Sequence, residues 1–140
     1  NPYIEDVARR AAVEGFLALA PDGLFPVGGY PGNDDDGRTL QGNLDQGKLR
    51  TDFLNSARFL KSHKLSTGKL GATGFCSGGG TVNYLAVELG ADMYAGVPHQ
   101  MHIYPGTQHG FHNNSTPRYV EAAAKLSWER TVAFFKKNLA

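Results

Sequence analysis

Cys76, the only cysteine of the chain, stands in the stretch best suited to chemistry. It follows the short apolar run 69–75, lies in the motif Gly-x-Cys-x-Gly-Gly and precedes the helix-like segment 81–89. This order predicts a strand, a tight turn and a helix, with the thiol beside a helix N-terminus that favours an anion. The positions of Gly74 and Gly78 are expected to require a residue as small as glycine, because the turn is strained and the backbones around it approach closely. The thiol should ionise readily and act as a nucleophile; the alternative is a buried, inert cysteine.

Three stretches of the chain, taken together, are similar to parts of one enzyme family. Gly-Phe-Cys-Ser-Gly-Gly at 74–79 resembles the cysteine turn of the dienelactone hydrolase (carboxymethylenebutenolidase) family, a branch of the α/β-hydrolases. Residues 104–113 resemble the loop that carries the family's catalytic histidine, and residues 1–23 resemble its first helix and the strand that follows. The resemblance implies a hydrolase that cleaves an ester or lactone through a cysteine, a histidine and an acid that orients the histidine.

The resemblance also indicates partners for the thiol. His109 lies in a glycine-rich loop after the nucleophile, which is the chain order of α/β-hydrolases, so it is the expected partner of Cys76. His112, in the same loop, is expected to be structural. The backbone N–H of Ser77 should be one donor to the oxyanion. The second donor would come from Asn1 or from before it.

The acid of the family's triad has no matching position. Between Cys76 and His109 a full arrangement needs a helix, three strands and two crossovers, which take about fifty residues or more. Only 32 residues separate them. Glu88 and Asp92 are the carboxylates in this interval, but Glu88 falls in a helix and Asp92 precedes a strand instead of ending one. The family's opening strands and its glutamate near the nucleophile are missing too.

Residues 98–102 mark the junction at which the family's segment is missing. Either the chain is incomplete and segments are closed up at this junction, or it is a shortened homologue. In a shortened homologue Cys76 and His109 act as a dyad, or another carboxylate such as Asp22 replaces the acid. A Cys–His pair tolerates the loss because it is activated partly by ionisation. The edge of a shortened sheet also predicts a homo-oligomer.

The rest of the chain alternates helical and apolar segments. Helical spacing predicts helices over 1–15, about 43–63 and from Thr116 to the end, with Thr116 as a cap. Continuous apolar runs predict further strands at 16–20, 93–97 and 101–104. Residues 21–42 are expected to form a loop on the functional rim or a mobile segment. The acidic run 34–36 is expected to be solvated, with a cation site as the alternative.

This alternation predicts an α/β fold in a single domain over residues 1–140. We expect a partial α/β-hydrolase fold with a mostly parallel sheet flanked by helices. It would lack the opening strands and the crossover that bears the acid.

Composition excludes several classes of function. The net charge is +1 and 19% of the residues are charged, which argues against a nucleic-acid partner. No apolar run approaches the roughly 20 residues of a membrane span and no leader is seen, so a cytoplasmic protein without a membrane partner is expected. Gly78–Gly80 does not make a phosphate loop, and no cofactor is expected.

Three hypotheses for the function remain. The leading one is a cysteine hydrolase of a small-molecule ester or lactone. The family's substrate is anionic and held by arginines, for which Arg38 and Arg118 are the candidates here. The second is a truncated, catalytically impaired scaffold that works as an oligomeric binding protein. The third is a metal site built from the histidines and the thiol, but His99 and His102 have strand spacing that turns them to opposite faces, so no metal is expected.

Overall fold

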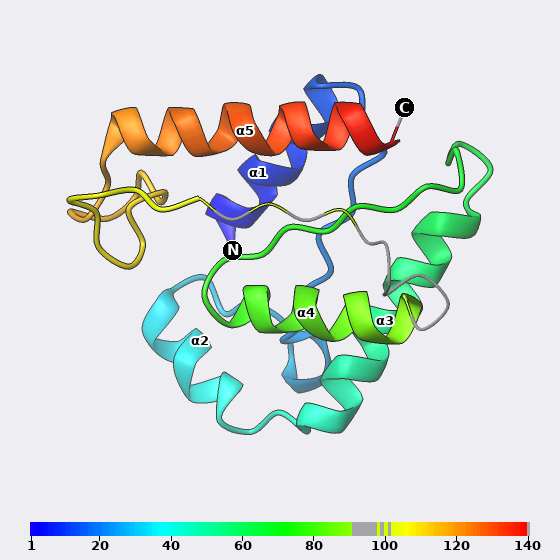
Figure 1. The fold of residues 1–140 in the computed structure, drawn as a ribbon. Helices are drawn as coiled ribbons and strands as arrows, with labels where there is room; N and C mark the ends of the chain where they lie inside the picture. The colour runs from blue at the N-terminus through cyan, green and yellow to red at the C-terminus, as the bar shows by residue number, and fades with distance from the viewer. Residues whose placement is uncertain (91–97, 99, 101, 140) are drawn as a thin grey trace. The chain divides into compact units, whose positions relative to one another are not determined.

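The computed structural model describes residues 1–90, 98, 100 and 102–139. The chain divides into two compact units, Asn1–Gly68 and Lys69–Ala140. Within the described residues the elements, in chain order, are α1 (Pro2–Val13), the 3-10 helix η1 (Phe25–Val27), α2 (Asp34–Gln41), α3 (Gln46–Ser62), α4 (Ser77–Leu89) and α5 (Glu121–Leu139) (Figure 1). The single domain over residues 1–140 stays a prediction.

The expected parallel sheet is wrong for the part of the chain that the structure describes, because no strand is found there. Residues 16–20 and 69–75 run without helix or strand between helices (Figure 1). An isolated extended segment is not a strand until another segment pairs with it, and among the described residues neither segment finds one. The predicted strand at 93–97 and the start of the one at 101–104 lie outside the described residues.

In the first unit, α1 begins and ends as its sequence predicts. The Asn1 side chain accepts a hydrogen bond from the Ile4 amide at 3.1 Å, and Pro2 occupies the first turn. Gly15, with φ +95°, follows the helix in a conformation that favours glycine. Val7 is buried on the inner face of α1.

Residues 21–42 are more ordered than the predicted loop, because they contain η1 and α2. Asn33 caps α2 by accepting a hydrogen bond from the Asp36 amide at 2.9 Å. The three aspartates of 34–36 form the first turn of this helix, where the helix dipole favours negative charge. The acidic run is therefore a helix start.

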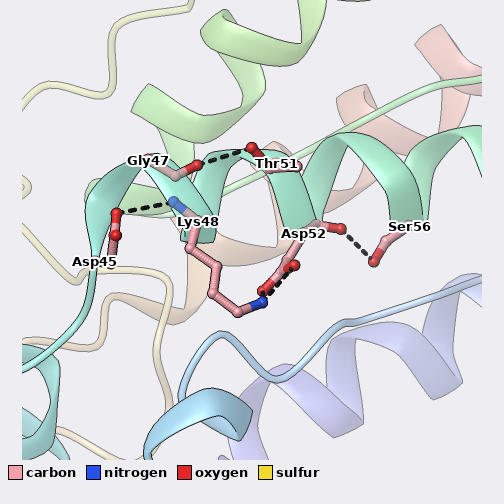
Figure 2. Close-up of polar contacts among 6 residues, drawn as sticks. All are labelled: Asp45, Gly47, Lys48, Thr51, Asp52 and Ser56. Atoms are coloured by element: carbon pink, nitrogen blue, oxygen red, sulfur yellow. Dashed lines mark hydrogen bonds and ion pairs between the residues drawn. The ribbon is translucent and has the colours of Figure 1, made fainter.

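Polar contacts link neighbouring turns of helix α3 (Figure 2). Asp45 caps it by accepting from the Lys48 amide at 3.0 Å, and the Lys48 ammonium binds the Asp52 carboxylate at 2.6 Å. Thr51 and Ser56 donate back to carbonyls one turn earlier. Leu54 on the same helix is buried.

The second unit holds α4 and α5. A Cβ built on Gly71 would lie 3.0 Å from Leu139 and 3.1 Å from Phe135, so the segment before α4 runs against the C-terminal part of α5. Leu85, Ala124 and Val132 are the buried apolar side chains described in this unit. No described helix is long and apolar enough to cross a membrane.

The predicted cap of the last helix is wrong. The Thr116 hydroxyl donates to the Asn113 carbonyl at 3.2 Å, and the residues after it form a further turn. Helix α5 begins only at Glu121. Its first hydrogen bond runs from the Ala124 amide to the Val120 carbonyl at 2.9 Å.

Candidate functional site: the Cys76 turn and the histidine loop

Cys76 has an unusual backbone conformation at the start of α4. Its φ is 55° and its ψ is −120°, and it is the one non-glycine residue with positive φ in the described part of the chain. The amide of Gly78 bonds the carbonyl of Phe75 at 2.9 Å, and the amide of Gly79 bonds the carbonyl of Cys76 at 3.0 Å. Such a conformation costs on the order of 1–3 kcal/mol and persists only where the surroundings impose it.

Gly74 makes this turn sterically feasible. A Cβ at Gly74 would overlap the Gly78 carbonyl and lie 2.9 Å from the Gly79 nitrogen. The prediction that Gly74 must be small is confirmed. For Gly78 the same prediction is wrong, because a Cβ there would meet nothing within 4 Å.

The thiol of Cys76 is exposed, which excludes the alternative of a buried cysteine. The amide of Ser77, next in the chain, donates to no acceptor among the described residues. The first turn of α4 carries no acidic residue. The Ser77 N–H and the positive end of the helix dipole are therefore available to a negative charge that develops beside the sulfur.

His109 is exposed in the loop between residues 104 and 120. Both His109 and Cys76 are described, and no hydrogen bond joins them. The loop is nevertheless closed: Phe111 donates its amide to the Gln108 carbonyl at 3.0 Å, and Val120 donates to the Phe111 carbonyl at 2.9 Å. His109 is thus carried by an ordered turn.

The ring of His112 connects this loop to the cysteine turn. It lies 4.5 Å from the ring of Phe75, the residue before Cys76, at an interplanar angle of 35°. Phe111 in turn lies 5.3 Å from Tyr104, and the Arg130 guanidinium of α5 lies 5.4 Å from the Tyr104 ring. We call this set, with members Phe75, Tyr104, Phe111, His112 and Arg130, the ring cluster. The sequence gives no local signal for the Phe75–His112 contact because the two residues are far apart in the chain.

Of the considered acids, Glu88 is the one described in the same unit as the histidine loop. Glu88 is exposed in α4, and a helix rise of 1.5 Å per residue puts it roughly 18 Å along the axis from Cys76. Asp92 lies outside the described residues. Asp22 belongs to the first unit, where its carboxylate accepts from the amides of Leu24 and Tyr30, each at 3.0 Å. The described residues of the second unit therefore assign no acid to His109.

The two arginine candidates differ in their surroundings. Arg38 lies on α2 in the first unit, 3.8 Å from Asp35, and both side chains are exposed. Arg118 belongs to the histidine loop, where its Nε would be 3.4 Å from a Cβ built on Gly110. Arg118 therefore lies beside the residue that follows His109.

Within the described ranges, no three His, Cys, Asp or Glu side chains converge on a metal position. His99 lies outside the described residues. An open groove of about 550 Å³ lies between residues 21–26 and α3. It belongs to the first unit, whereas Cys76 and His109 belong to the second. Its charged walls are already engaged, since Lys48 pairs with Asp52 and Asp22 binds backbone amides.

Comparison with known proteins defines the family. The family model of the dienelactone hydrolase family matches residues 1–98 and 89–139. The chain belongs to the dienelactone hydrolase family. The two matched stretches overlap at residues 89–98, and this overlap ends where the junction expected from the sequence, residues 98–102, begins. Such a match is consistent with a truncated member of the family.

Three relatives illustrate how much of the family the chain covers. "Putative hydrolase fragment YghX" of Escherichia coli (strain K12) is 73% identical over 45 residues, which are 32% of this chain and 38% of that protein. "Protein usf" of Aquifex pyrophilus is 28% identical over 189 residues, covering 97% of this chain and 81% of the relative. "Putative carboxymethylenebutenolidase" of Aquifex aeolicus (strain VF5) is 33% identical over 99 residues, covering 68% of this chain and 42% of that protein.

These alignments bear on the missing segment. The matched part of the chain covers less than half the length of the first and of the third of these relatives. The alignment with the second is longer than the whole chain of 140 residues, so that relative has internal residues without a counterpart here. The second observation agrees with the expectation that a segment of the family is missing from this chain.

Proposed function

We propose that this chain is a hydrolase of a small-molecule ester or lactone in which Cys76 is the nucleophile and His109 its partner. The backbone of Cys76 supports the proposal most directly. A strained residue at the N-terminus of a helix, with an exposed thiol and a free amide after it, is the arrangement that a nucleophile on a tight turn requires.

The reaction would proceed in two halves. The Cys76 thiolate attacks the carbonyl carbon, and the N–H of Ser77 donates to the oxyanion that forms. The intermediate collapses to a thioester as the protonated His109 gives its proton to the departing alkoxide. His109 then takes a proton from water, whose oxygen attacks the thioester and releases the acid and the thiolate.

In this proposal His109 is the partner of the Cys76 thiol, and no carboxylate is assigned to orient its ring. A cysteine nucleophile depends less on a third group than a serine does, because a thiol forms its reactive thiolate more readily than a hydroxyl forms an alkoxide. The turn closed by the Phe111 amide and the Gln108 carbonyl supports the role of His109, since His109 lies within it.

The test is the intact mass of the chain after brief exposure to p-nitrophenyl acetate. We expect a starting mass near 15.1 kDa, a gain of one acetyl group and its loss with time. Cys76→Ala should gain no acetyl group, and His109→Ala should gain and lose it more slowly. Equal acetylation of wild type and Cys76→Ala would contradict the proposal.

A second candidate function is an oligomeric binding scaffold, and one observation favours it. Residues 17–20 make no backbone hydrogen bond among the described residues, and Leu17 and Leu19 are 39% and 44% exposed. An apolar segment with free backbone groups can pair with the same segment of a second copy.

Sedimentation velocity tests this candidate. We expect a dimer or larger species that Leu19→Lys dissociates. The matched control is Val13→Lys, at a position that is 88% exposed at the end of α1. A monodisperse monomer of wild type would contradict the scaffold.

A further inference from the structure

His112 joins two segments that the proposed chemistry must hold together. It is three residues after His109 in the histidine loop, and its ring lies against Phe75, one residue before Cys76. Both rings are half-buried, whereas Cys76 and His109 are exposed. The ring contact thus joins the residue before Cys76 to the loop that carries His109.

The ring cluster gives His112 a second ring contact. Phe111 lies edge-on to His112 at 6.2 Å and is tilted by 39° against the ring of Tyr104, over which the Arg130 guanidinium lies. The amide of Val120 ties the Phe111 carbonyl to the start of α5. The loop and the start of α5 therefore restrain the His112 ring. Through its contact with Phe75, the His112 ring in turn restrains the residue before Cys76.

From these contacts we infer that His112 is a positioning residue for the Cys76–His109 pair, acting through its ring contact with Phe75. The inference rests on the proposed function, since it concerns the same thiol. It assigns no proton transfer to the His112 imidazole. Its physical basis is that the reacting groups must be held within a fraction of an ångström, and that a misplacement of about 1 Å can cost a hundredfold in rate.

The acetylation rate of Cys76 by p-nitrophenyl acetate, measured over a range of ester concentrations, tests this role. His112→Ala should lower the maximal rate by about ten- to a hundredfold and leave the half-saturating concentration nearly unchanged. His112→Phe keeps an aromatic ring and should restore the rate. If His112→Phe is as slow as His112→Ala, or if His112→Ala matches wild type, the inference is overturned.

A second pair of variants keeps the test decisive if His112→Ala does not fold. Phe75→Leu removes the same contact from the other side and should slow acetylation to a similar degree. Adding His112→Phe to Phe75→Leu should then give no recovery, because the partner ring is gone. Recovery in that double variant would overturn the inference.

Two further variants separate this inference from the proposed function. If Cys76→Ala is acetylated like wild type, or His109→Ala has no effect, the proposed function fails whatever His112 does. If Cys76→Ala and His109→Ala behave as proposed while His112→Ala loses only thermal stability, the function holds and the positioning role fails.

Discussion

Gly74 and Gly78 lie so close together that a Cβ on Gly74 would overlap the carbonyl group of Gly78. The contact is one-sided, because a Cβ on Gly78 would point into open space. Two glycines of the same motif therefore serve different purposes. Gly74 is required by sterics, and Gly78 supplies only the backbone against which Gly74 packs.

This relationship predicts opposite effects for two alanine substitutions. Gly74→Ala should lower the free energy of unfolding by about 1–3 kcal/mol, because the turn has to shift. Gly78→Ala lies in the first turn of α4 and should be neutral or stabilising by up to about 1 kcal/mol, because alanine favours a helix. Chemical denaturation of both variants measures the difference. Equal destabilisation would show that the overlap is not what limits position 74.

The strain at Cys76 predicts that glycine stabilises this position. Glycine adopts φ 55° without a steric penalty, whereas alanine has a Cβ and therefore retains the penalty. Relief of about 1–3 kcal/mol of strain exceeds the roughly 0.5–1 kcal/mol entropic cost of glycine. Cys76→Gly should therefore unfold at a higher temperature than Cys76→Ala. The reverse order of melting temperatures would contradict the strained conformation.

The cap of α3 predicts a loss of stability in the first unit. Asp45→Ala leaves the Lys48 amide without its acceptor and should cost about 1 kcal/mol. Asp45→Asn keeps the acceptor and should retain most of the stability. Lys48→Met removes the exposed pair with Asp52, which is worth only about 0.3–0.5 kcal/mol. Thermal unfolding followed by circular dichroism ranks the three variants, and a loss in Lys48→Met as large as in Asp45→Ala would contradict the ranking.

The first turn of α5 predicts a dependence on pH. Lys125 donates a hydrogen bond to the Glu121 carboxylate and attracts its charge, so the pKa of Glu121 lies below its ordinary value. The pair therefore stabilises the folded state above the ordinary carboxyl range and loses that effect as pH falls through the lowered pKa. Carbon NMR titration of Glu121 should show the lowered pKa, and Lys125→Met should return it to the ordinary range. An unchanged midpoint in Lys125→Met would refute the pairing.

The sequence predicts helices and turns where their cause is local. Asn1 and Pro2 at the start of α1, and Gly15 after it, act through their own backbone and side chains, and the predicted helix is confirmed. Thr116 and Pro117 carry the same local signal, but the Thr116 hydroxyl donates a hydrogen bond to the Asn113 carbonyl and does not cap a helix. A competing partner three residues earlier is enough to move the start of α5.

Features that depend on distant segments could not be predicted in this way. Residues 16–20 have the composition of a buried strand, yet a strand exists only with a neighbour, and none is described for them. At the candidate site, the glycine spacing around Cys76 is local and predicted the tight turn. The contact of His112 with Phe75 joins two parts of the chain, so only the structure reveals it.

The hydrogen bond between the Val120 amide and the Phe111 carbonyl also bears on how this loop can evolve. It closes the loop before α5 begins, and within the enclosed turn the hydroxyls of Ser115 and Thr116 bond back to Asn113. An insertion or deletion within residues 114–117 would change the size of this enclosed turn and leave both of its anchors in register. Length variation among related sequences should therefore be tolerated there, and selected against between His109 and Phe111.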